Sequence, residues 1–385
     1  MSRVSLKNEV DFSKITKIYL ALGSQCNMCC RHCSQTPIKS NEIIMHNVSD
    51  DVWCLLDNYI RYAVSHKDKT RIVVFWGGEP LLHWNFIKEV VTRYTDKFSV
   101  LRKMSASFLF TFTTNGLLLT DDKIDFINQH FIKVLFSYDA PYPFAVRGKI
   151  SDAVIQQVYK LKRYAILTSF NALNTDYYLA CRCLHKKFPM VRHSYNFNFW
   201  HMFTMPEEIY TLDIETLRKN IRKLVIASKM GDTDAWSALN SCLWGTQYPG
   251  KSLLFRKYRV RGCFSGTNIV SVKLNGDVLS CYNSSEVIGS INDSLDDIFK
   301  NSLFAFVNRK SSECETCRHN DICTGNCSFS LRDEEGKYYI CEKYMKVLYD
   351  VLKEESKNLL TSVSEEEFAW FMEEYKKDDV FVSNF

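Results

Sequence analysis

The amino-acid sequence predicts an α/β fold, a partial (β/α)6 TIM-type barrel followed by a cysteine-rich C-terminal region. Two observations predict this fold. Over roughly the first two hundred residues, short segments rich in β-branched and aromatic residues alternate with amphipathic helical patterns. Beyond them, cysteines at close spacing replace the periodic pattern. Alternating units imply parallel strands joined by crossover helices, and six units are too few to close a barrel of eight.

Each element of the barrel is predicted from its local pattern. The six expected strands are residues 18–22, 71–76, 107–113, 133–137, 165–171 and 195–200. Helical patterns lie between them at 51–65, 84–98, 121–129, 151–164 and 175–187. The first helix has an N-cap candidate, Ser49, and carries apolar residues at helical spacing: Val52, Leu55, Leu56, Tyr59, Ile60 and Ala63.

Four regions are expected along the chain. The barrel domain spans residues 1–205, and a bridge with a basic amphipathic helix at 214–230 occupies 206–255. The cysteine-rich region spans 256–360 and contains a last helix at 342–357, and an acidic, aromatic tail helix occupies 361–385. Because a loop-rich region of this size buries little apolar area, it is expected to need stabilising cross-links such as bound metal.

Composition narrows the class of protein. Among 385 residues, Lys+Arg number 49 and Asp+Glu 44, so the net charge is +5 and both signs are spread along the chain. This balance predicts no nucleic-acid partner, and the lack of a long apolar run or signal-peptide core predicts a cytoplasmic protein without a membrane partner. Fifteen cysteines in such a chain are expected to bind metal rather than to form disulfides.

The first cysteine cluster follows the first expected strand. Cys26, Cys30 and Cys33 have the spacing C-x3-C-x2-C. Cys29 does not fit this spacing and is not assigned as a ligand. Three thiolates can hold three irons of a 4Fe-4S cluster and leave the fourth iron open to a small molecule. The alternative is a zinc knuckle, for which His32 is the fourth ligand at hand.

A glycine-rich turn follows the second expected strand. The segment is Phe75-Trp-Gly-Gly-Glu-Pro80. Gly77 and Gly78 let the backbone approach a ligand closely, and Glu79 offers a carboxylate to an ammonium group. Taken alone, the four residues Gly-Gly-Glu-Pro are also compatible with a plain turn.

Together these residues resemble the radical S-adenosylmethionine (radical SAM) superfamily. The resemblance covers about the first 200 residues, and it implies that Cys26, Cys30 and Cys33 bind the catalytic 4Fe-4S cluster. It further implies that the SAM-binding residues are His32, Gly77, Gly78, Glu79, Pro80, Thr114, Asn115, Ser137, Arg147 and Asn171. In this comparison His32 replaces an aromatic residue that stacks on adenine, Arg147 pairs with the SAM carboxylate and Asn171 reaches the ribose. Ala140 departs from the family pattern, which has glycine there.

The second constellation is Cys263-x12-Gly276-x4-Cys281 followed by Cys314-x2-Cys317-x5-Cys323-x3-Cys327 and by Cys341. Two zinc ribbons are the plain alternative, but only one C-x2-C pair is present. The pattern resembles the seven-cysteine SPASM domain, which binds two auxiliary iron–sulfur clusters. The resemblance implies an outer cluster on Cys314, Cys317, Cys323 and Cys341, and an inner cluster on Cys263, Cys281 and Cys327. The cofactors implied are therefore three 4Fe-4S clusters and S-adenosylmethionine.

The fourth ligand of the inner cluster is left open by the sequence. Cys242 is the nearest upstream cysteine, 21 residues before Cys263. If Cys242 binds, the inner cluster is closed and accepts electrons. If it does not, one iron is open to a substrate thiolate, and this second arrangement is the one we favour.

Both domains together resemble radical SAM/SPASM enzymes, most of which modify peptides. The implied reaction is reductive cleavage of SAM and abstraction of hydrogen from a ribosomally made peptide, with formation of a thioether, C–C or cyclophane crosslink. A sulfatase-maturating activity that makes formylglycine is the alternative, but Tyr282 stands where those enzymes have an aspartate base. A non-catalytic iron–sulfur electron carrier is the remote alternative.

The expected partners are the precursor peptide and a flavodoxin or ferredoxin-type reductant. Only 25 residues precede Cys26, too few for a winged-helix leader-binding domain at that end. Recognition of the leader is therefore expected from a separate protein, from the tail after Ser364, or from an exposed sheet edge.

Overall fold

The structure, a computed structural model, describes most of the chain. The described residues are 12–33, 35, 48–66, 68–97, 108–142, 147–189, 193–197, 207–243, 268–294, 296–298, 300–301, 316–319, 341–357 and 359–384. Four of the expected cluster cysteines, at positions 263, 314, 323 and 327, lie outside them.

In the described part of the chain, nine strands form one sheet in the order β6-β5-β4-β3-β2-β1-β7-β8-β9. The strands are β1 (Lys17–Ala21), β2 (Arg71–Trp76), β3 (Phe108–Thr114), β4 (Lys133–Ser137), β5 (Tyr164–Phe170), β6 (His193–Phe197), β7 (Ile269–Lys273), β8 (Asp277–Leu279) and β9 (Val287–Ser290). Strands β1 to β6 are parallel to their neighbours, as the sequence predicts for a partial barrel.

The cysteine-rich region joins this sheet. Strand β7 pairs in parallel with β1, and β8 and β9 extend the sheet by antiparallel pairing. The sequence gives no sign of this pairing, because β1 and β7 lie about 250 residues apart. The region expected at 256–360 is therefore continuous with the barrel sheet at β1.

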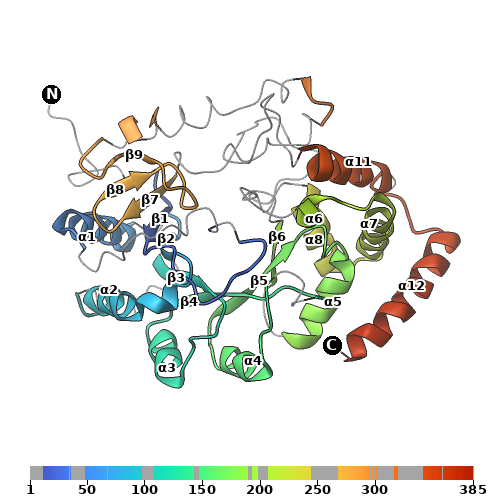
Figure 1. Cartoon of the computed structure of the whole chain (residues 1–385), viewed down its shortest axis with the longest axis horizontal. Coiled ribbons are helices and arrows are strands. Elements are labelled where there is room, and N and C mark those ends of the chain that lie inside the picture. Colours follow the sequence, from blue (N-terminus) through green and yellow to red (C-terminus); the bar gives the residue numbers. More distant parts are fainter. Residues whose placement is uncertain are drawn as a thin grey trace.

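One face of the sheet packs against helices. In β1 the side chains of Ile18 and Leu20 are fully buried in the main hydrophobic core, whereas Tyr19 on the opposite face is half-buried. The helices that follow the strands lie along the outside of the curved sheet (Figure 1). They are α1 (Asp50–Ser65), α2 (Trp84–Lys97), α3 (Asp121–Gln129), α4 (Asp152–Tyr159) and α5 (Tyr177–Lys187).

The sequence predicts the start of α1 correctly but not the end of α4. Ser49 caps α1 by accepting a hydrogen bond from the Val52 N–H, as predicted, and the six apolar residues expected on that helix are buried. The prediction of a helix to residue 164 is wrong, because α4 ends at Tyr159. Asn128 of α3 accepts a hydrogen bond from the Lys162 N–H and donates one to the Lys160 carbonyl, which holds the chain in a turn before β5.

The bridge is more helical than the sequence predicts. A short helix, α6 (Glu207–Tyr210), precedes the predicted basic helix α7 (Ile214–Lys229), and a third helix, α8 (Thr233–Leu243), follows it. Helix α8 contains Cys242, whose side chain lies outside the described set. The position of that thiol therefore stays a prediction.

The last described helices pack on the bridge. A π-helical turn at Cys341–Met345 leads into α11 (Lys346–Glu355), and α12 (Glu365–Asn384) runs along α5 and α7 (Figure 1). The basic residues of α7 face acidic residues of both helices. Arg218 pairs with Glu354 of α11, while Lys219 pairs with Glu374 and Lys229 with Glu367 of α12.

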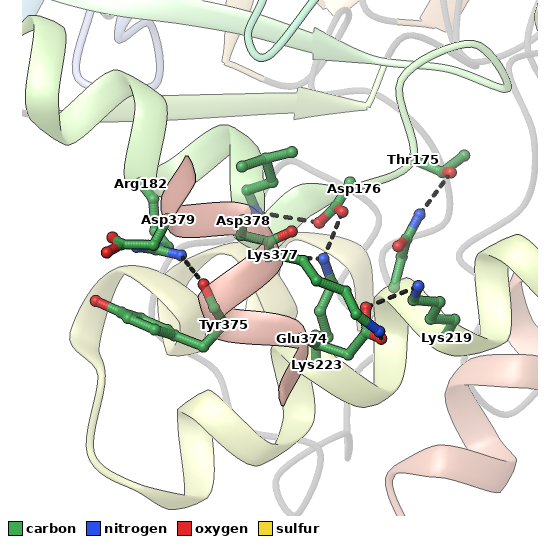
Figure 2. Close-up of polar contacts among 12 residues, drawn as sticks. Thr175, Asp176, Arg182, Lys219, Lys223, Glu374, Tyr375, Lys377, Asp378 and Asp379 are labelled. Carbon is green, nitrogen blue, oxygen red and sulfur yellow. Dashed lines mark hydrogen bonds and ion pairs between the residues drawn. The ribbon is translucent and has the colours of Figure 1, made fainter. Parts of the chain in front are cut away.

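A buried lysine lies at the centre of this contact. Figure 2 shows Lys223 of α7 between Asp176, the N-cap residue of α5, and Asp378 of α12. Its Nζ lies 2.6 Å from the first carboxylate and 2.8 Å from the second, and the side chain is 2% exposed. Beside it, Arg182 of α5 pairs with Asp379 and lies over the ring of Tyr375. One buried cation thus joins three helices that are distant in the sequence.

No helix in the described ranges has both the length and the apolar content needed to cross a membrane.

We expect Lys223→Ala to lower the free energy of unfolding by about 3 kcal/mol, since it leaves two largely buried carboxylates without their cation. Denaturant unfolding followed by circular dichroism measures this loss, and limited proteolysis reports the release of α12. Lys377→Ala is the matched control, because Lys377 is exposed and, within the described ranges, its bonds go to Glu373 and Glu374 of its own helix. Equal stability of the two variants would contradict this role for Lys223.

Candidate active site

The expected site residues gather at one edge of the sheet. Strands β1 to β5 are parallel, so their carboxyl ends lie on the same side, and functional groups of α/β folds gather there. The first cysteine loop follows β1, and the Gly-Gly-Glu-Pro turn follows β2. Thr114 ends β3, Ser137 ends β4 and Asn171 directly follows β5.

The cysteine loop and the glycine turn are packed backbone to backbone. The Gly78 N–H donates to the Gly23 carbonyl at 3.0 Å, and the Glu79 N–H donates to the Gln25 carbonyl at 2.8 Å. A Cβ atom on Gly77 would lie 2.5 Å from the Gly23 oxygen, and one on Gly78 would lie 2.2 Å from the Gln25 oxygen. Glycine is required at both positions, because any side chain would push the two loops apart.

The three expected ligand thiols lie in this loop and are half-buried, whereas Cys29 is exposed. The Cys30 thiol donates to the Arg147 carbonyl at 3.6 Å. Burial raises the pKa of Cys30 to about 11; the Arg147 guanidinium opposes that rise, and Cys33, Asp139 and Cys26 add to it. The thiols are thus near enough to repel one another as anions, and a bound cationic centre would relieve that repulsion.

Three cysteine thiols in one loop are a donor set that can hold an iron–sulfur cluster. Among the described residues, no three His, Cys, Asp or Glu side chains are close enough to hold one metal ion. In a 4Fe-4S cluster each cysteine binds a different iron, so its ligands surround a body larger than one ion. His32, which a zinc knuckle would need, instead directs Nε2 toward Arg147 and Asp139.

Glu79 ties the ends of β2 and β3 together. Its carboxylate is 1% exposed, and Oε1 accepts hydrogen bonds from the Leu81 N–H and the Thr114 hydroxyl. Oε2 accepts one from the Asn115 N–H at 2.9 Å. Burial raises the pKa of Glu79, and the three hydrogen bonds oppose that rise. Since Oε2 accepts one bond in the described structure, it keeps capacity for a further donor such as an ammonium group.

Asn115 joins the third strand to the cysteine loop. Its Nδ2 donates to Asn27 Oδ1 at 2.8 Å and lies 3.9 Å from Cys26 Sγ. The sequence comparison expected Thr114 and Asn115 to contact SAM. In the structure Thr114 and Asn115 both hydrogen-bond the Glu79 carboxylate, and Asn115 also bonds Asn27; their contact with SAM stays a prediction.

A buried carboxylate that the sequence comparison did not assign lies at the end of β4. Asp139 is fully buried and accepts hydrogen bonds from Arg147 Nε at 2.9 Å and from the Ser169 N–H at 2.8 Å. His32 is 3% exposed, and its Nε2 lies 3.2 Å from Arg147 Nη2 and 3.6 Å from Asp139. The structure thus brings together His32 and Arg147, which were expected at different parts of SAM, around a protein carboxylate.

The remaining expected residues lie at the same edge. Pro80 begins a short 3-10 turn, Pro80–His83, after Glu79. Ser137 is buried at the end of β4. Asn171 is fully buried; its Oδ1 accepts the Leu173 N–H, while its Nδ2 has no hydrogen-bond partner within the described residues. A buried donor of this kind fits a bound polar ligand such as a ribose.

Three of the seven auxiliary cysteines are described. Cys281 is buried just after β8, and the Asn283 N–H donates to its Sγ at 3.4 Å. Cys317 and Cys341 are half-buried. The pKa of Lys346 is raised chiefly by its hydrogen bond to Glu342, and both thiols add to that rise, so they lie near the same ammonium group. The structure therefore places two of the four residues expected at the outer cluster in one neighbourhood.

Two family models match the chain. Residues 20–174 match the radical SAM superfamily, and residues 263–327 match SPASM, an iron–sulfur cluster-binding domain. A curated relative is the radical SAM cyclopropyl synthase TigE of Paramaledivibacter caminithermalis, which is 23% identical over 370 residues, covering 88% of this chain and 73% of the relative.

Solved structures share the fold. Native anSMEcpe with bound AdoMet has a TM-score of 0.62 and 16% identity, covering 90% of this chain and 98% of its own. Streptococcus suis SuiB bound to the precursor peptide SuiA has a TM-score of 0.50 and 17% identity, covering 86% of this chain and 76% of its own.

We expect Glu79→Ala to weaken SAM binding by about 2 kcal/mol, roughly 30-fold in affinity, because a charge-assisted contact is lost. Equilibrium binding to anaerobically prepared protein measures it. Thr114→Val keeps the carboxylate and removes only one of its hydrogen bonds, so its effect should be several-fold smaller. Unchanged affinity in Glu79→Ala would show that the carboxylate does not bind the ammonium group.

Proposed function

Because this chain is an enzyme of the radical SAM superfamily with a C-terminal SPASM domain, we propose that it is a maturase that crosslinks a ribosomally made peptide through an unactivated C–H bond. The observation that carries this proposal is the β1–β7 pairing. Together with the hydrogen bond from Gln35, two residues after Cys33, to Asn283, two residues after Cys281, it attaches the SPASM region to the barrel domain. A substrate held between the two would be within reach of both cofactors.

In this proposal the cofactors are SAM and three 4Fe-4S clusters. When bound and reduced by a flavodoxin or ferredoxin-type reductant, the cluster on the first cysteine loop would supply the electron for reductive cleavage of SAM and so for hydrogen abstraction. The proposed ligands of the first cluster are Cys26, Cys30 and Cys33. Those of the outer auxiliary cluster are Cys314, Cys317, Cys323 and Cys341, and those of the inner one are Cys263, Cys281 and Cys327.

The protein's own residues hold and orient these groups. Glu79 receives the amino end of SAM beside the cysteine loop, and the Gly77–Gly78 turn lets that loop pack closely because neither glycine has a side chain. Asn171 offers its buried Nδ2 to the ribose. Asp139 accepts a hydrogen bond from Arg147 and so orients its guanidinium, which in this proposal binds the SAM carboxylate.

The bond that forms is best supported as a C–C bond. The relative TigE is named a cyclopropyl synthase, and it aligns with 88% of this chain. A formylglycine-forming activity stays the second candidate. The structural match to anSMEcpe extends over 98% of the anSMEcpe chain. The residue after Cys281 is Tyr282, however, and a phenol hydroxyl is a poorer proton acceptor than the carboxylate expected there in sulfatase-maturating enzymes.

Leader recognition is best explained by a separate protein or by the β6 edge. The acidic face of α12 is already paired with α7. The edge of β9 is covered, since Asn301 donates to the Ile288 carbonyl and Asp293 accepts the Ser290 N–H. The tail helix and one of the two edges of the described sheet are thus used within the chain.

Iron content tests the cofactor proposal. Anaerobically reconstituted protein should bind about twelve irons per chain, four for each of three clusters. Replacement of Cys26, Cys30 and Cys33 by Ala should remove about a third of this iron and abolish cleavage of SAM to 5'-deoxyadenosine. Zinc-loaded, iron-free protein that still modified its peptide would refute the proposal.

The peptide itself tests the reaction. Co-expression with a precursor encoded beside this gene should yield a peptide lighter by two hydrogens for each bond formed, with fragmentation suppressed inside the crosslinked segment. The variant lacking the three loop cysteines should leave the peptide unmodified. An aldehyde that reacts with hydrazide, found in place of a crosslink, would assign the enzyme to formylglycine formation instead.

A further inference from the structure

The segment that follows Cys281 is attached directly to the first cysteine loop. Cys281, Tyr282 and Asn283 come from the SPASM region, yet they contact residues beside the SAM-side cysteines. Two independent contacts make this attachment, one through a hydrogen bond and one through aromatic rings. The inference below rests on the proposed function, in which Cys281 binds an auxiliary cluster.

The first element is a hydrogen bond to sulfur. The Asn283 N–H donates to Cys281 Sγ at 3.4 Å, and Cys281 is 6% exposed. The Met28 N–H makes the same contact with Cys26 Sγ, also at 3.4 Å and also two residues after the cysteine. Hydrogen bonds to the sulfurs of a cluster stabilise its more negative, reduced state and so raise its reduction potential.

The second element fixes the residue that makes this bond. Gln35, two residues after Cys33, donates from Nε2 to Asn283 Oδ1 at 3.1 Å. Both side chains are buried, with exposures of 6% and 3%. A buried amide pair is costly to break, because each polar group would lose its partner without gaining water. The side-chain bond therefore fixes Asn283 and, with it, the N–H that points to sulfur.

Aromatic packing holds the intervening residue. The Tyr282 ring stacks on Tyr19 of β1 with centroids 4.4 Å apart and planes within 9° of parallel. The Trp76 ring lies beside this stacked pair and meets both rings edge-on, with centroids 4.9 Å from Tyr282 and 5.8 Å from Tyr19. Trp76 immediately precedes the Gly77–Gly78 turn. Tyr282 is thus held against the two strands whose ends carry the SAM-side loops.

We propose that Gln35 and Asn283 are positioning residues that keep the Asn283 N–H on the Cys281 sulfur and thereby set the reduction potential of the auxiliary cluster bound there. Because Gln35 belongs to the loop of the SAM-binding cluster, that potential depends on the placement of the first loop. Outer residues of this kind are known to tune metal sites through their first ligands.

The test is an EPR-monitored redox titration of the full-length, reconstituted protein. The signal to follow is the one altered in Cys281→Ser and unaffected by added SAM. Gln35→Ala and Asn283→Ala should each shift its potential to a more negative value. The double variant should shift it no further than the larger single shift, because all three variants break one and the same hydrogen bond.

Asn292→Ala is the matched control, since Asn292 is exposed and bonds Asp51 and Ser290 away from the cysteines. In this variant the reduction potential of the auxiliary cluster should equal that in the unmodified protein. Unshifted potentials in the Gln35 and Asn283 variants, or shifts that add in the double variant, would overturn the proposal.

Failure of the proposed function gives a different result. If no auxiliary cluster bound at Cys281, the iron content of Cys281→Ser would equal that of the unmodified protein and no EPR signal would change in it. If a variant lost the cluster outright, its iron content would fall, and a hydrogen bond needed only for folding would be the explanation. The positioning role requires full iron content together with a shifted potential.

Discussion

The candidate active site depends on one strand that has a parallel neighbour on each side. Strand β1 leads into the first cysteine loop, β2 leads into the glycine turn, and β7 leads through a hairpin to Cys281. The register of all three is set by the face that carries Ile18 and Leu20, since a slip of one residue would turn those buried side chains outward. Core packing therefore fixes the relative positions of the cysteine loop and the glycine turn, which leave the same edge of the sheet, whereas β8 returns antiparallel to β7 before Cys281.

Two buried carboxylates then organise the edge that the strands create. Glu79 accepts hydrogen bonds from β3 residues and from its own turn, and Asp139 accepts them from Arg147 and from β5. Neither carboxylate is exposed by more than 1%, so their orientations do not depend on solvent. The site is thus preorganised by acceptors that belong to the protein, and a ligand meets donors and backbone already in place.

The sequence predicts what is local and misses what is not. The motifs around Cys26 and Glu79 are recognisable because their spacing is short, and the six barrel strands follow from their composition. The end of α4 is set by Asn128 of the preceding helix, which no periodicity within α4 reports. Pairing of β1 with β7 and the bond between Gln35 and Asn283 join residues about 250 positions apart, and a single sequence carries no signal for either.

The three-helix contact at Lys223 has a consequence for synthesis of the chain. Asp176 precedes this lysine by 47 residues, whereas Asp378 follows it by 155. As the polypeptide leaves the ribosome, α7 thus has only one of its two counter-ions, and its basic face is open until α12 emerges. A nascent chain that pauses in this interval exposes a cationic, partly apolar surface of the kind that chaperones bind. Packing of α12 on α7 is therefore a late step in folding.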